Sequence, residues 1–117
     1  MPTEWSNDPE VAVREIEQSV LWELEGDWVD LRLVYKWCLR LGGSEEDALR
    51  LALSIAESLM RAGKMVPGEF TDDAYRVWAG EVDGWMAKIN DGVRSLGRPP
   101  DIGEVVWFAL PADADSP

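Results

Sequence analysis

The chain has 117 residues, 23 acidic and 11 basic side chains, a formal net charge of −12 and no histidine. A chain of this length forms one domain, and its apolar fraction of 46% can support a hydrophobic core. Without histidine there is no Ser/His/Asp or Cys/His catalytic set. One cysteine excludes an internal disulfide, and a Cys/His zinc site lacks its ligands. No Gly-rich nucleotide-binding motif occurs. We therefore expect a protein that is not an enzyme and that needs no cofactor or metal.

Neither a signal-peptide pattern at the N-terminus nor an apolar run long enough to cross a membrane is visible in the sequence. We expect a cytoplasmic protein with no membrane partner. The charge is unevenly distributed, because residues 1–31 hold nine carboxylates against one basic residue, Arg14.

The first predicted helix begins at Asp8-Pro9, a typical N-cap followed by proline at the first helical position. Apolar residues then recur with helical spacing, and Gly26 is expected to end the helix in the left-handed conformation. Its outward face is rich in carboxylates, of which we select three: Glu10, Glu17 and Glu25.

A second helix is predicted to follow, with Asp27 as its N-cap and Trp28 at its first position, ending at Gly42-Gly43. Cys38 lies on its apolar stripe and is expected to be buried rather than nucleophilic. The opposite face carries the best basic row of the chain at i, i+4 and i+8: Arg32, Lys36 and Arg40.

The third helix begins at Ser44, where SEED forms a capping box, and ends at Gly63. A strand is predicted over residues 65–70 and a second one over residues 104–110, rich in β-branched and aromatic residues. Between them we predict a short helical stretch over residues 72–78 and a longer helix from Val82 to Gly97.

This order predicts an α+β, mainly helical, winged-helix-like domain over residues 1–110, followed by a flexible tail over residues 111–117. Three N-terminal helices precede a short antiparallel two-stranded ribbon, and a helical insertion separates the two strands. Because a two-stranded ribbon is marginal by itself, we expect it to pack on the helices through Trp107.

Three runs of the sequence resemble a group of small uncharacterised bacterial proteins of the high-GC Gram-positive type. They are DWVDL at a helix start, SEEDALRLALSIAESLMRAGKMVPGEF, and the late GRPPDIGEVVWFAL. The shared signposts are the D-W-x-x-L helix start and the late strand that contains Trp. The resemblance covers about residues 26–110 and implies a winged-helix-like fold. It implies no activity, so no functional residue is transferred.

For function, we favour a small acidic protein-binding module, an inhibitor or immunity-type protein that covers a basic partner such as a toxin. A negative surface attracts basic proteins and accelerates their association. Exposed tryptophans are frequent in binding hot spots, and four lie away from the clear apolar stripes: Trp5, Trp22, Trp37 and Trp78.

Two alternatives stay open. A winged-helix regulator would bind DNA, with Arg32, Lys36 and Arg40 as its basic patch, but the acidic chain makes nucleic acid an unfavourable partner. A homodimer that buries the tryptophans would instead be a structural or interaction protein.

Overall fold

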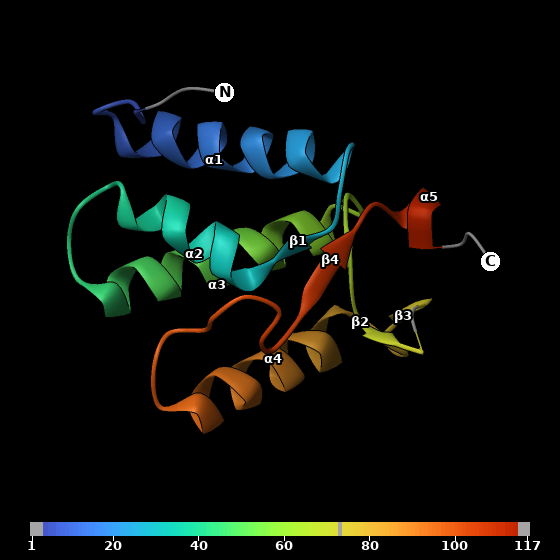
Figure 1. The fold of residues 1–117 in the computed structure, drawn as a ribbon. Helices are drawn as coiled ribbons and strands as arrows, with labels where there is room; N and C mark the ends of the chain where they lie inside the picture. The colour runs from blue at the N-terminus through green and yellow to red at the C-terminus, as the bar shows by residue number, and fades with distance from the viewer. Residues whose placement is uncertain (1–3, 73, 115–117) are drawn as a thin grey trace.

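The computed structural model describes residues 4–72 and 74–114 (Figure 1). Four helices of 9 to 17 residues, one short helix and four strands make a mainly helical α+β fold in this part of the chain. In chain order the elements are α1 (Pro9–Leu24), β1 (Val29–Asp30), α2 (Leu31–Leu39), α3 (Glu45–Arg61), β2 (Val66–Thr71), β3 (Ala74–Val77), α4 (Val82–Leu96), β4 (Trp107–Ala109) and α5 (Pro111–Ala114).

The strands form one antiparallel sheet in the order β1-β4-β2-β3. The predicted antiparallel pairing of the two main strands is confirmed, with Val66 opposite Ala109 and Gly68 opposite Trp107. The prediction of only two strands is wrong, because β1 pairs with β4 and β3 pairs with β2. Two residues of β1 are too few for a strand to show in a sequence pattern.

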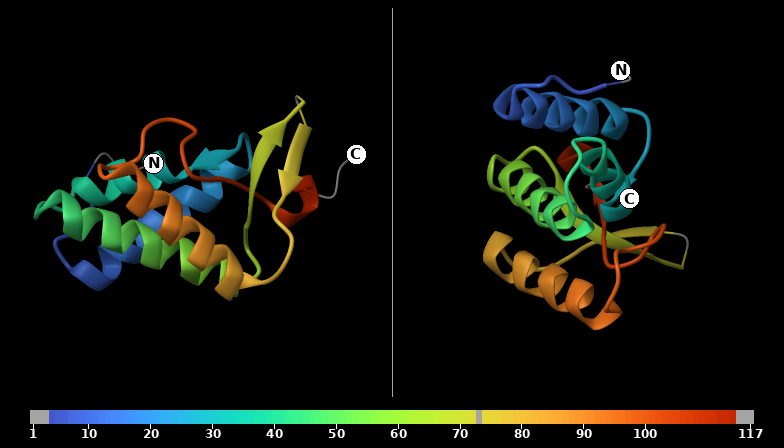
Figure 2. Two further views of the ribbon diagram at one scale, coloured as in Figure 1. Left: turned by 90° about the horizontal axis from the view of Figure 1, so that it is seen from below. Right: turned by 90° about the vertical axis from the view of Figure 1, so that its left-hand side faces the viewer.

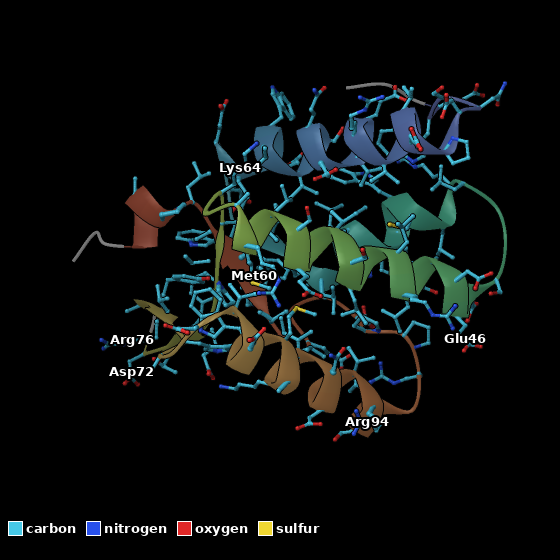
Figure 3. The ribbon with its side chains drawn as sticks, turned by 180° about the vertical axis from the view of Figure 1, so that it is seen from behind. Glu46, Met60, Lys64, Asp72, Arg76 and Arg94 are labelled. Carbon is cyan, nitrogen blue, oxygen red and sulfur yellow. The ribbon has the colours of Figure 1, made fainter. Side chains whose placement is uncertain are left out.

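The helices are stacked on one side of the molecule, with α1 at one end, α2 and α3 in the middle, and α4 at the other end (Figure 2). Met60, which is buried, lies between α3 and α4 (Figure 3). The β2–β3 hairpin projects away from this stack (Figure 2). The α1 helix therefore offers a long outer face, and the hairpin offers a second surface.

Side chains cap the starts of α1, α2 and α3, and the start of α2 is displaced from its prediction. Asp8 caps α1 through the Glu10 N–H, and Ser44 caps α3 through the Asp47 N–H, as predicted. The predicted α2 start at Asp27 is wrong, because Asp30 is the N-cap and accepts the Leu33 N–H at 3.1 Å. Residues 29–30 are held extended by their pairing with β4, so the helix begins after them.

The end of α1 also differs from the prediction. The helix ends in an ordinary right-handed turn at Glu25, and Gly26 is not among the glycines with positive φ. The predicted stop of α4 at Gly97 is confirmed, and this glycine, at φ +65°, has the left-handed conformation.

The predicted helical stretch over residues 72–78 is wrong. Residues 74–77 form β3, which pairs with β2 through Phe70 opposite Tyr75 and Glu69 opposite Arg76. Asp72, at φ +51°, lies in the turn that joins the two strands. The segment is so short that its apolar residues fit the helical period as well as the strand period. The pairing with β2 makes it a strand.

The sheet packs on the helices through Phe108 rather than through Trp107. Phe108 is fully buried, whereas Trp107 is only half-buried and points to the opposite face of the sheet. Neighbouring residues of a strand point to opposite faces of the sheet. The prediction of Trp107 as the packing residue therefore had the whole strand facing the wrong way.

The predicted C-terminal tail begins with a short helix, since Pro111–Ala114 form α5. Residues 115–117 of that predicted tail lie outside the described residues.

Candidate protein-binding surfaces

The outer face of α1 carries the three predicted carboxylates, which we call the acidic face: Glu10, Glu17 and Glu25. Glu10 and Glu25 are exposed, and Glu17 is half-buried. The opposite side of the helix packs on the core through Ala12, Ile16, Val20 and Leu24. The three carboxylates therefore lie on the solvent side.

None of the ion pairs found in the described residues involves a residue of α1. The carboxylates of α3 and α4, by contrast, are largely paired: Arg50 contacts Glu46 and Asp47, and Arg61 contacts Glu57 and Asp83. The carboxylates of α1 therefore have no ion-pair partner within the described part of the molecule, and they are available to a positively charged partner.

Three of the four predicted interface tryptophans are core residues. Trp5 is 9% exposed, and its indole N–H donates to the Trp37 carbonyl oxygen at 2.8 Å. Trp37 is 3% exposed and meets Trp5 edge to face. Trp78 is 8% exposed beneath the Lys88 ammonium, 4.0 Å from the ring centroid. Only Trp22, which is 61% exposed on α1, stays a candidate.

The three basic residues predicted on α2 do lie in a row, but two of them already contact other side chains of the protein. Arg32 pairs with Asp101 at 3.4 Å, and the Arg40 guanidinium lies 5.7 Å from the Trp5 ring centroid. Lys36 is exposed and has no ion-pair partner among the described residues. One unpaired lysine is far fewer cations than a DNA backbone contact requires.

Cys38 is buried in the core, as the sequence predicts. Burial raises the pKa of its thiol to about 12, so the nucleophilic thiolate is not formed near neutral pH.

A second surface, not found from the sequence, gathers four aromatic side chains on the outer side of the sheet. We call it the aromatic face: Trp28, Phe70, Tyr75 and Trp107. The Phe70 ring is central, with centroids 5.0 Å from Trp28, 5.5 Å from Tyr75 and 5.5 Å from Trp107. These are the edge-to-face separations at which aromatic pairs attract. Trp28 and Phe70 stay 42% and 40% exposed.

Gly68 makes room for this arrangement. A Cβ atom at this position would lie 2.7 Å from the Tyr75 ring, so only glycine lets that ring lie against β2. The Tyr75 hydroxyl then lies 3.0 Å from the Val66 carbonyl oxygen and 3.1 Å from that of Trp107. Burial raises the Tyr75 pKa, so the hydroxyl stays protonated as a donor.

One sequence signal could have revealed the aromatic face. Side chains of residues 68–77 would alternate between the two sides of a β-hairpin if the segment were read as two strands joined by a turn. Phe70 and Tyr75 face each other across the hairpin, which is invisible when residues 72–78 are taken as a helix. Trp28 joins them only because β1 is a strand.

A hollow of about 470 Å³ lies on the other side of the hairpin, between β3 and α4. Its Glu69 carboxylate accepts the Trp78 indole N–H at 3.1 Å and lies 3.6 Å from the Lys88 ammonium. Arg76, also in its lining, extends from the projecting hairpin (Figure 3). The Glu69 carboxylate and the Lys88 ammonium in this hollow are therefore paired with each other.

Within residues 4–72 and 74–114, no group of three or more acidic or cysteine side chains is placed to hold a metal ion. No helix in this part of the chain has the length and apolar character required to span a bilayer.

Comparison of the chain with protein-family models finds no family that matches, and comparisons with curated proteins and with solved structures find no match either. The resemblance noted from the sequence therefore stays a prediction. The inference of function depends on the two surfaces described above.

Proposed function

We propose that the protein is a non-catalytic binding module of the cytoplasm, an inhibitor or immunity-type protein that covers a basic surface of another protein. The observation that carries this proposal is the acidic face of α1. It lies on a helix at one end of the helical stack, and its carboxylates take part in no ion pair within the described residues. The free, buried Cys38 fits a reducing compartment.

Electrostatics favours this role on two grounds. A net charge of −12 gives long-range attraction for a positively charged partner, and steering of this kind raises association rates by about 10- to 1000-fold. Charges that lack internal partners also lose no intramolecular ion pair when a partner binds. Binding therefore carries no added cost of breaking such pairs beyond the usual losses of rigid-body freedom, side-chain ordering and desolvation.

A winged-helix DNA-binding regulator is the second candidate, favoured by the element order. A helix, a strand, two helices and a strand occur in sequence, and β1 pairs with the last strand, β4. On this interpretation β3 and α4 form an insertion before the final strand. The surface charge supports the regulator less well, because Arg50 and Arg61 of α3 are engaged by carboxylates. In addition, α4 packs along α3, the helix that would enter the major groove.

The test is a pull-down from an extract of the native organism, at low salt and again at about 1 M salt, where the Debye length falls to about 3 Å. We expect a stoichiometric basic protein that high salt releases and mass spectrometry identifies. Exchange of Glu10, Glu17 and Glu25 for Lys should abolish its capture, because the attractive charge is reversed.

A matched variant changes the same amount of charge elsewhere, with Lys in place of Glu45, Glu81 and Asp91, which belong to α3 and the α4 region. This control should retain the partner. Equal loss from both variants would point to net charge alone. Capture of DNA would favour the regulator, and recovery of the chain by itself would favour a homodimer. Each of these results contradicts the proposal.

A further inference from the structure

The aromatic face has the composition of a contact surface. Four rings gather on the outer side of the sheet, with Phe70 meeting the other three edge to face, and both Trp28 and Phe70 are about two-fifths exposed. Exposed aromatic clusters of this kind are unusual on a surface with no partner, and tryptophan and tyrosine dominate binding hot spots. The face lies where the hairpin projects from the helices (Figure 2).

The charges beside these rings that take part in no ion pair among the described residues are negative. Among the described strand residues on this side of the sheet there is no basic residue. Arg76 lies opposite Glu69 in the hairpin and therefore faces the other side. Asp27 precedes Trp28, and Asp72 follows Phe70 by two residues in the hairpin turn (Figure 3). Both carboxylates are exposed, and neither takes part in an ion pair found among the described residues.

Aromatic ring faces beside free carboxylates attract one side chain above others, the arginine guanidinium. It is planar, stacks on rings and binds carboxylates with paired hydrogen bonds. A second copy of this acidic chain would bring like charges together. An apolar partner would remove water from Asp27 and Asp72 and offer no hydrogen bonds in its place. The chemistry of the surface therefore selects a cationic occupant.

The aromatic face also continues from the acidic face. Glu25, the last carboxylate of that face, lies three residues before Trp28, so their Cα atoms are at most about 11 Å apart. One partner surface of ordinary size can cover both.

We infer that the aromatic face binds arginine side chains of the same basic protein that the acidic face attracts. This inference rests on the proposed function and adds to it the residue type that the partner must present. The acidic face supplies steering, and the rings supply preference for arginine over lysine.

The test uses two defined probes of equal charge, nona-arginine and nona-lysine peptides, titrated into the full chain at physiological salt. We expect the arginine peptide to bind about fivefold more tightly, because a guanidinium stacks on aromatic rings and pairs with carboxylates through two hydrogen bonds, which an ammonium cannot do. In NMR spectra, the indole N–H signals of Trp28 and Trp107 should shift.

The exchange of Trp28 and Phe70 for Leu should reduce the arginine-to-lysine preference to near one. Both side chains are partly exposed, and circular dichroism checks that the fold is kept. Trp22→Leu is the matched control: its ring is 61% exposed but lies on α1, away from the aromatic face, so the preference should persist.

The outcomes separate the two proposals. If the Trp28/Phe70 variant keeps the arginine preference, or if the Trp28 and Trp107 signals do not shift, the aromatic face is not the arginine site. If both peptides bind equally and binding is lost on reversing Glu10, Glu17 and Glu25, the proposed function stands and this inference is wrong. If neither peptide binds, both are wrong.

Discussion

One ion pair, between Arg98 and Glu104, determines the shape of the loop before β4, which lies beside the aromatic face. Arg98 holds Glu104 through two hydrogen bonds of 2.8 and 2.9 Å, and the same carboxylate accepts the Asp101 N–H at 2.7 Å. The turn closed by these contacts places Gly103 against the Trp107 ring, where a Cβ atom would lie 3.3 Å from the ring. The hydrogen bonds from Arg98 and from the Asp101 backbone lower the Glu104 pKa to about 2.

We predict that NMR titration finds the Glu104 carboxyl ionising near pH 2, and that Arg98→Gln raises its pKa toward the ordinary value. Because the folded-state pKa is lowered, the carboxylate stabilises the loop above its unfolded pKa. That contribution is lost as the pH falls toward about 2. Arg94→Gln, which removes the exposed pair with Asp91, is the control and should leave the Glu104 titration unchanged. An unshifted Glu104 pKa in the wild-type chain would contradict the loop geometry.

At the scale of the elements, Asp30 connects a helix to a distant loop. The side chain is 7% exposed; one carboxylate oxygen accepts the Leu33 N–H at 3.1 Å and the other accepts the Gly103 N–H at 2.8 Å. It therefore caps α2 and fixes the loop that precedes β4. Asp27, which the sequence favours as the cap, accepts only the N–H of its neighbour Trp28 at 2.7 Å.

We predict that Asp30→Ala lowers the free energy of unfolding by about 2–3 kcal/mol, since a helix cap is lost and a second, partly buried N–H is left without its acceptor. Asp27→Ala should change stability by less than about 0.5 kcal/mol, as exposed substitutions usually do. Urea denaturation of the two variants measures both values. The reverse ranking would place the start of α2 at Asp27 and contradict β1.

At the scale of the whole molecule, the excess of carboxylates opposes folding. Charges of the acidic face repel one another, and the described residues provide no cation partner for them. A surface kept for binding in this way lowers the stability of the free protein.

We predict that raising the salt concentration from about 0.01 to about 0.15 M increases stability by about 0.5 kcal/mol, because the Debye length falls from about 30 to about 8 Å. Exchange of Glu10, Glu17 and Glu25 for Gln should reduce that gain and raise the melting temperature at low salt. Gln at the ion-paired Glu46, Glu57 and Glu104 is the control, and should lower the low-salt melting temperature instead. Wild-type stability that falls with salt would show that ion pairs outweigh repulsion.

The sequence by itself determined what is local. Caps at Asp8 and Ser44, the stop at Gly97 and the burial of Cys38 follow from side chains acting within a few residues, and the structure agrees with each. The acidic face could also be located, because Glu10 and Glu17 belong to one long helix of clear periodicity and Glu25 is its C-cap.

Only the tertiary structure decided what depends on residues far apart in the chain. Val29 and Asp30 become a strand because β4 pairs with them, and that pairing moves the start of α2. Residues 74–77 become a strand because β2 is beside them, and Phe108 rather than Trp107 turns inward because the register with β2 requires it. The burial of Trp5 against Trp37, and the gathering of Trp28 with Phe70, have the same origin. Hydrogen bonding between strands and packing between distant side chains have no periodic trace in the sequence, so the aromatic face emerges only from the folded chain.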